Sequence, residues 1–415
     1  MSHEPQPVLD GFDEIFHTPI RSMDRSAPFN APRSTCASRV AQRTSLEFRP
    51  ASRPIHHSHM LNTSANDLEF DLLSRDASTS VNTVDSTQSQ HFTSIEVCAG
   101  AGGQALGLEK AGFDHRALVE IDSAACETLK YNRPEWNVIE GDLREFSGTP
   151  YRGIDLFAGG LPCPPFSVAG KQLGENDERD MFPTALRLIK EIQPKAVMIE
   201  NVRGILSPRF DAYRRKITQE LNELGFEVGW RQFNAKDFGV CQVRQRVILV
   251  ALRSEYWENF RWPVGNCETH SSVGETLADL MASNGWKQSH EWAVKANGCA
   301  PTIVGGSKKH GGPDLGPTRA KREWAELSVD GHGIANDPPN AQFLGSPKLT
   351  VRMVARLQGF DDSWHFCGKK TSAYRQVGNA FPPPVAHAVA KQIRSALAGQ
   401  TNQVGILEDL FSLAH

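Results

Sequence analysis

A single cysteine in the middle of the chain has the surroundings expected of a nucleophile. Cys163 lies in the turn 162–165, directly after the apolar run 154–158, which is typical of a buried strand. Prolines on both sides of the cysteine fix the backbone, so the thiol has a defined direction. Open α/β sheets bind their ligands at the carboxyl ends of the strands, where this thiol would lie. The alternative is an inert buried thiol, which is the usual fate of an isolated cysteine.

Charged side chains stand at the ends of other predicted strands. Glu200 and Asn201 end the strand that begins at Ala196, and Arg244 and Arg246 precede the last strand of the series. Taken singly, the carboxylate could cap a helix and the arginines could form a surface ion pair. Taken together with a thiol at the same edge, they predict a site for an anionic or polar planar substrate.

A glycine-rich turn and two acidic strand ends predict a cofactor that contains a nucleoside. Residues 100–103 join the first predicted strand to the first helix, and glycines there let the backbone approach a ligand closely. Glu120 ends the second strand, where it could accept hydrogen bonds from two ribose hydroxyls. Asp142 ends the third strand and could take an adenine amino group. These features alone do not separate NAD from S-adenosylmethionine, but a dehydrogenase has no use for the thiol and the two guanidinium groups.

The elements that must position these residues follow an alternating pattern. Strand and helix patterns alternate over residues 92–253, which predicts a doubly wound, mostly parallel α/β sheet. The alternation stops over residues 254–347, which are irregular and rich in Gly, Pro, Trp and basic residues. We interpret this stretch as a smaller inserted domain, after which residues 348–400 complete the first domain. Residues 1–91 have the polar composition of a disordered tail, and residues 401–415 form a second tail.

Composition excludes several classes of protein. The chain has 415 residues, a net charge of −3 and no long apolar run, so we expect a soluble, cytoplasmic protein whose basic surface is only local. Its eight cysteines are scattered and form no CxxC pair. This argues against a zinc site and against a disulfide scaffold, and we expect no metal.

From about Thr93 to Ala398 the sequence resembles the DNA cytosine-5 methyltransferases of bacterial restriction–modification systems. Segments that match the family occur in the family's order: Glu96 to Gly103, Val119 to Asp122, Gly141-Asp142, Pro162-Cys163, Glu200 to Val202, Gln242 to Arg246, Leu349 to Arg352, Leu357 to Phe360, and Gln376 to Ala380. The resemblance implies a Rossmann-like sheet that binds S-adenosylmethionine. It also implies that residues 254–347 form the target-recognition domain.

The resemblance assigns a catalytic role to each of four residues. Cys163 would attack C6 of a cytosine flipped out of the duplex, which makes C5 nucleophilic. Glu200 would hydrogen-bond ring N3 and the exocyclic amine, and Arg246 would hold the base O2 with Arg244 behind it. A base, which could be water, would then remove the C5 proton before the cysteine leaves.

The resemblance also assigns residues to the cofactor. These are Glu96, Cys98, Ala99, Gly100, Ala101, Gly102, Gly103, Glu120, Ile121, Asp142, Leu143 and Asn379. The chain departs from the family at three positions. Glu96 stands where the family usually has Asp, Cys98 replaces an aromatic ring that would pack on the adenine, and Pro164 replaces a common Gln.

Double-stranded DNA is the partner that the resemblance implies. The residues expected to contact it are Ser167, Lys171, Gln172, Lys308, Lys309, Arg319 and Arg322. We expect a monomer, associated with the nucleoid through its DNA, with a restriction endonuclease as a functional rather than physical partner. An RNA cytosine methyltransferase and a catalytically silent DNA-binding regulator are the alternatives. The sizeable recognition domain argues against the first, and the intact Cys163, Glu200 and Arg246 argue against the second.

Overall fold

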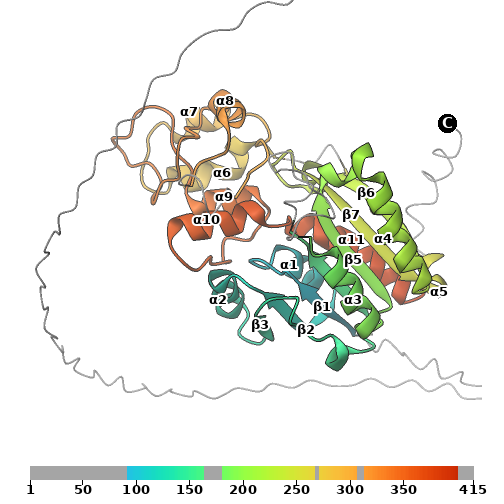
Figure 1. Ribbon diagram of the computed structural model, residues 1–415. Helices are drawn as coiled ribbons and strands as arrows, with labels where there is room; N and C mark the ends of the chain where they lie inside the picture. Colours follow the sequence, from blue (N-terminus) through green and yellow to red (C-terminus); the bar gives the residue numbers. More distant parts are fainter. Residues whose placement is uncertain (1–90, 163–179, 267–270, 306–312, 401–415) are drawn as a thin grey trace, which may run out of the picture. The chain divides into compact units, whose positions relative to one another are not determined.

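The structure is a computed structural model that describes residues 91–162, 180–266, 271–305 and 313–400 (Figure 1). All of these residues belong to one compact unit, Thr83–His415, and the other unit, Met1–Asn82, lies outside the described residues. In the described part of the chain, no helix is both long enough and apolar enough to cross a bilayer.

A mixed sheet forms the centre of the described unit. Its strands are β1 (Phe92–Val97), β2 (Phe113–Glu120), β3 (Val138–Glu140), β4 (Leu156–Gly160), β5 (Ala196–Val202), β6 (Phe226–Asn234) and β7 (Gln245–Arg253). They lie in the order β3-β2-β1-β4-β5-β7-β6, and only β7 runs antiparallel to its neighbours. Chain order reverses between β1 and β4, and a crevice opens at such a switch point at the carboxyl ends of the strands. The predicted doubly wound, mostly parallel sheet is confirmed.

Helices cover both faces of this sheet (Figure 1). They are α1 (Gly103–Lys110), α2 (Ser123–Asn132), α3 (Phe182–Ile192), α4 (Asp211–Glu223) and α11 (Pro383–Leu397). Side chains of α3 and α4 pack with alternate strand residues such as Ile95 and Val97. Leu108 of α1 and the apolar face of α11 pack on the opposite side of the sheet. Short 3-10 turns occupy some of the connections: η1 (Thr149–Tyr151), η3 (Arg203–Leu206), η4 (Pro208–Phe210) and η5 (Ala235–Phe238).

Glycines allow α1 and α11 to approach closely. A Cβ atom on Gly103 would lie 2.2 Å from the Phe381 carbonyl, and one on Gly107 would lie 2.4 Å from the Ala386 Cβ. Neither separation is compatible with a side chain, so the sequence must carry glycine at both positions. This contact fixes the first turn of α1, which follows the glycine-rich turn.

The segment after residue 253 contains helices that its irregular sequence did not predict. They are α5 (Ser254–Trp257), α6 (Val273–Ala282), α7 (Ser289–Lys295) and α8 (Thr318–Glu326). Two helices follow: α9 (Val351–Leu357), which the helical periodicity of these residues indicates, and α10 (Lys370–Asn379). The strand–helix alternation does stop at residue 254, since the described part of 254–347 contains helices α5 to α8 and no strand of the sheet. Trp286, Trp292 and Trp324 are buried among these helices and belong to one hydrophobic cluster with Ala105 and Leu129 of α1 and α2.

Candidate active site

An ion pair lies at the carboxyl end of β5. Glu200 pairs with Gly160 of β4 on one side and with Ile248 of β7 on the other. Arg246 Nε lies 2.7 Å from Glu200 Oε1, and the two side chains are only 13% and 9% exposed, respectively. Burial raises the pKa of Glu200, although Arg246 and then Arg244 act in the opposite direction. A buried carboxyl with a raised pKa can hold a proton and donate it in a hydrogen bond.

Arg244 makes no hydrogen bond to Glu200 but binds three carbonyls in two other backbone segments. It is fully buried, and its guanidinium donates to the carbonyls of Ile303 (2.6 Å), Gly378 (3.0 Å) and Ala380 (2.9 Å). Its charge still lowers the pKa of Glu200. The geometry therefore shows a role in holding backbone that the sequence did not suggest.

Two buried glutamines extend this contact, and sequence reasoning assigned no role to either. Gln242 Nε2 donates to Gln358 Oε1 (2.5 Å), and Gln358 Nε2 donates to the Ala380 carbonyl (2.6 Å). Gln242 Oε1 also accepts from the Ile303 backbone N–H (3.0 Å). The sequence did offer a reason to consider them, because both glutamines lie within segments that match the family.

The glycine-rich turn has the backbone geometry that only glycine adopts easily. Gly100 and Gly102 have φ of +55° and +87°. A Cβ on Gly102 would lie 2.9 Å from the ring of Trp364, whose Nε1 donates to the Ala101 carbonyl (3.1 Å). Cys98 also has a positive φ, of 52°, which is uncommon for a residue with a side chain and is found at functional sites.

Glu120 is fixed at the end of β2 by three backbone groups. Its Oε2 accepts from Gly100 N–H (2.7 Å), and its Oε1 accepts from Ile121 N–H (2.9 Å) and Asp122 N–H (2.8 Å). These bonds hold the carboxylate at the glycine-rich turn. Oε1 already accepts two hydrogen bonds and Oε2 accepts one, so Oε2 can accept one further bond, for example from a hydroxyl.

Ile121 and Asp142 follow the ends of neighbouring strands. The Ile121 side chain is exposed, whereas the Asp142 carboxylate is held by a hydrogen bond. The Ile121 side chain is 65% exposed, which is unusual for an isoleucine and provides an open apolar surface. The Asp142 carboxylate is held by Arg144 Nη2 at 2.5 Å, and this hydrogen bond lowers the pKa of Asp142 to about 2. Arg144 therefore competes with any amino group that would donate a hydrogen bond to the Asp142 carboxylate. Leu143, by contrast, is buried in the core.

Two buried polar side chains near the turn lack partners among the described residues. Glu96 Oε2 has no hydrogen bond, and burial, with a smaller effect from Glu120, raises the pKa of Glu96 well above its ordinary value. Both amide atoms of Gln104, in the first turn of α1, also lack partners. The sequence analysis missed Gln104. It could have been found as a polar residue four positions before Leu108, on the same, apolar face of the predicted helix. Buried polar atoms of this kind call for a ligand or an ordered water.

The remaining predicted residues are distributed as follows. Asn379 is exposed at the end of α10, while Ala99, Ala101 and Gly103 are buried. Arg319 and Arg322 are exposed on α8, where Arg319 pairs with Glu323. Six predicted site residues lie outside the described residues: Cys163, Ser167, Lys171, Gln172, Lys308 and Lys309.

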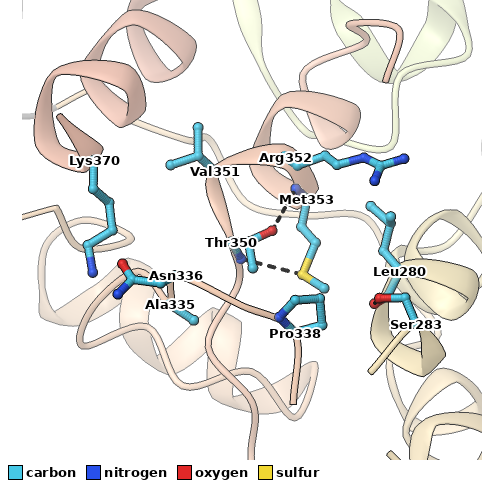
Figure 2. Close-up of a pocket in the computed structure, with 10 residues that line it drawn as sticks. All are labelled: Leu280, Ser283, Ala335, Asn336, Pro338, Thr350, Val351, Arg352, Met353 and Lys370. Atoms are coloured by element: carbon cyan, nitrogen blue, oxygen red, sulfur yellow. Dashed lines mark hydrogen bonds between the residues drawn. The ribbon is translucent and has the colours of Figure 1, made fainter. Parts of the chain in front are cut away.

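A hollow of about 320 Å³ lies apart from these residues, between α6 and the start of α9 (Figure 2). Figure 2 shows Met353 reaching back to the start of α9, where its Sδ accepts from Thr350 N–H (3.4 Å) and Thr350 Oγ1 accepts from Met353 N–H (3.2 Å). This is a helix cap in which sulfur takes the place of the usual carboxylate. None of the lining residues is a predicted site residue, so the hollow adds nothing to the site.

Comparison with known proteins decides the family. The C-5 cytosine-specific DNA methylase family matches the chain over residues 92–395. The chain belongs to this family. It is 56% identical over 309 residues to Type II methyltransferase M.NgoMIV of Neisseria gonorrhoeae, covering 74% of this chain and 98% of that protein. It is 55% identical over 316 residues to Type II methyltransferase M.NaeI of Lentzea aerocolonigenes, covering 74% and 76%, respectively. The resemblance inferred from sequence is confirmed, and the chain is a DNA cytosine-5 methyltransferase.

Solved structures agree on the fold. The chain is similar to the Entamoeba histolytica methyltransferase EhMeth, with a TM-score of 0.53, 15% identity and coverage of 74% of this chain and 99% of that one. It is also similar to a Spodoptera frugiperda DNMT2 mutant, with a TM-score of 0.51, 18% identity and coverage of 73% and 99%. At these identities the likeness shows the methyltransferase fold alone.

The family implies S-adenosylmethionine as the methyl donor, and the described residues fit such a molecule. The carboxylate of Glu120 is fixed beside the turn, and a Cβ on Gly100 or Gly141 would meet no atom within 4 Å, so both backbones border open space. The exposed Ile121 offers a flat apolar surface for a purine ring. In the described part of the chain, no cluster of three or more His, Cys, Asp or Glu side chains could hold a metal ion.

Proposed function

We propose that this methyltransferase modifies a cytosine that has been flipped out of double-stranded DNA, through a covalent bond between Cys163 and C6 of the base. The observation that supports this most directly is the buried pair Glu200–Arg246 beside the end of β4. Cys163 follows the last residue of β4, Gly160, by three positions in the sequence. A flat polar ring bound at this edge would meet a carboxyl, a guanidinium and a thiol.

Cys163, Glu200 and Arg246 carry the steps in which the base is attacked and held. The Cys163 thiolate adds to C6, and the ring electrons move toward C5 and N3. Protonated Glu200 donates to N3 as negative charge develops there, which its raised pKa favours. Arg246 is held by Glu200 with its guanidinium at the site and binds the O2 of the base. C5 then gains the methyl group, and a water molecule acting as base takes the C5 proton. The electrons of the C5–H bond re-form the C5–C6 double bond, and the Cys163 thiolate leaves C6.

The cofactor would be held by the turn and the neighbouring strand ends. S-adenosylmethionine supplies an electrophilic methyl group when it is bound. Glu120 would accept from a ribose hydroxyl through Oε2, and Ile121 would pack on the purine. Asp142 would accept from the purine amino group after Arg144 releases it. Asn379, at the exposed end of α10, would contact the amino-acid part of the cofactor.

The biological role proposed here is the modification half of a restriction–modification pair. Its support is the identity of more than half of the aligned residues with two proteins named Type II methyltransferases. In this role the enzyme acts as a monomer on DNA in the cytoplasm and protects a short sequence from a cognate endonuclease. An RNA substrate or a silent regulatory role is not favoured by these relatives.

Bisulfite sequencing tests the substrate. Host DNA should acquire 5-methylcytosine in one short sequence context when the chain is expressed, and Cys163→Ala should acquire none. A duplex that carries 5-fluorocytosine at the target position tests the covalent step, because fluorine cannot leave C5 as the proton does. The native chain should then remain attached to the DNA on a denaturing gel. A native chain that methylates DNA without forming this complex contradicts the proposed mechanism.

A further inference from the structure

Two glycines from distant parts of the chain touch each other near the predicted cofactor residue Asn379. A Cβ on Gly378 would lie 2.4 Å from Gly305 N, and a Cβ on Gly305 would lie 2.3 Å from Asn379 Oδ1 and 2.6 Å from the Arg375 carbonyl. Neither glycine has a positive φ. Space rather than backbone conformation therefore requires glycine at both positions, and the Asn379 side chain lies directly against the backbone of Gly305.

Hydrogen bonds to Arg244 and to the Val243 carbonyl hold the segment that contains Gly305. We name residues 300–305 the contact segment, which lies within the predicted recognition domain. Arg244 Nη1 donates to the Ile303 carbonyl (2.6 Å), while Arg244 Nη2 donates to the carbonyls on either side of Asn379. Thr302 Oγ1 donates to the Val243 carbonyl (2.6 Å). One guanidinium thus clamps the contact segment against the end of α10.

We propose that Gly305 is a positioning residue for the cofactor, because the contact segment sets the place of the Asn379 side chain. This inference rests on the proposed role of Asn379 as a cofactor contact. Its consequence is a direct physical link between the predicted recognition domain and the cofactor site. A substitution in the contact segment therefore alters cofactor affinity. By linkage, its effect on the free energy of unfolding differs between the free and the cofactor-bound protein by the same amount.

Calorimetric titration of S-adenosylhomocysteine into the full-length chain tests the proposal. Gly305→Ala is expected to weaken binding about tenfold, the loss expected for one displaced hydrogen bond to a charged ligand. Gly333→Ala is the matched control. It lies in the same predicted domain, and the nearest atom to its new Cβ would be Lys348 Nζ at 3.6 Å, an ordinary contact. Binding to this control should be unchanged.

A double-mutant cycle separates positioning from general damage. Asn379→Ala should weaken S-adenosylhomocysteine binding, and Gly305→Ala should have little further effect once Asn379 is absent. An equal loss in both backgrounds would overturn the inference, as would a normal affinity of Gly305→Ala beside a weakened Asn379→Ala. A normal affinity of Asn379→Ala would instead overturn the proposed cofactor contact, and the inference with it.

A milder variant covers the case in which Gly305→Ala does not fold. Thr302→Val removes the hydrogen bond to the Val243 carbonyl and leaves the glycine contact free of added atoms. It should weaken binding about threefold, within the range for one neutral hydrogen bond, and lower the melting temperature by only a few degrees. Unchanged affinity in this folded variant contradicts the proposal.

Discussion

The Glu200 carboxyl has a raised pKa in spite of its arginine partner, and this suits a hydrogen-bond donor to the base. Glu200→Gln should lower the methyl-transfer rate about 10²–10⁴-fold, the usual contribution of a positioned acid. The wild-type rate should fall as pH rises through the raised pKa, because the neutral acid is the active form. The variant should lose this alkaline limb. Single-turnover transfer of tritiated methyl groups across pH measures both effects, and an unchanged alkaline limb in Glu200→Gln would assign it to another group.

Because the Glu96 carboxyl is buried, we expect the free energy of unfolding of the cofactor-free protein to depend on pH. Its folded pKa lies well above the ordinary 4.5 because burial disfavours the charged form. Above pH 4.5 the unfolded chain loses this proton before the folded chain does, so the free energy of unfolding falls as pH rises toward the folded pKa. Glu96→Gln removes this effect. Urea unfolding should show a greater advantage of the variant at about pH 8 than at about pH 5. The same difference at both values would argue against a buried neutral acid.

The site residues were predictable where strand ends determine position. Glu120, Asp142 and Glu200 follow apolar runs, and parallel strands end at one edge of a sheet, so their approximate places followed from the sequence alone. The contacts of Arg244 did not, because its partners are backbone carbonyls up to 136 positions away in the chain. No pattern of residue types records which carbonyls a buried guanidinium will meet.

The packing of α1 on α11 depends on a glycine in the middle of a helix. Gly107 costs α1 about 1 kcal/mol of helix propensity relative to alanine. It is nevertheless required, because a Cβ there would lie 2.4 Å from the Ala386 Cβ and 2.6 Å from His387 N. Gly107→Ala should therefore lower the free energy of unfolding by about 1–3 kcal/mol in urea denaturation. Gly141→Ala, which meets no atom within 4 Å, is the control and should change it little. A stabilised Gly107→Ala would mean that the two helices can separate without cost.

The elements of the sheet were easier to predict than those of the inserted segment. Apolar strands of 5–9 residues such as β4 and β7 alternate with helices such as α3, whose apolar residues recur at helical spacing. Helices α7 and α8 are short, and each buries a single tryptophan, Trp292 and Trp324 respectively. A window with one buried apolar residue shows no period. Helix α6 is different, because Val273, Leu277 and Leu280 recur at helical spacing, and this signal in the sequence was overlooked. The inserted segment therefore looked irregular in the sequence although its core is well packed.

At the scale of the whole molecule, Arg244 joins the sheet, the contact segment and the end of α10. Replacing it with methionine keeps much of its volume but removes the guanidinium donor from the carbonyls of Ile303, Gly378 and Ala380. The Ala380 carbonyl keeps only the hydrogen bond from Gln358 Nε2. We expect Arg244→Met to lower the free energy of unfolding by about 3–5 kcal/mol, as for other broken buried charge networks. Hydrogen exchange should rise most in the peptides that cover residues 300–305 and 374–380.

A second arginine, Arg253, provides the control for this prediction. Unlike Arg244, it binds carbonyls only next to strands of the sheet. Arg253 donates to the carbonyls of Leu224 (2.5 Å) and Pro194 (3.3 Å) at the opposite end of β7. Arg253→Met should also reduce stability, yet the added exchange should be confined to that end of the sheet. If Arg244→Met and Arg253→Met increased exchange in the same peptides, the molecule would open as one unit and Arg244 would have no special part in joining its domains. Selective exchange at the contact segment would show that one side chain couples the edge of the sheet beside Glu200 to the predicted recognition domain.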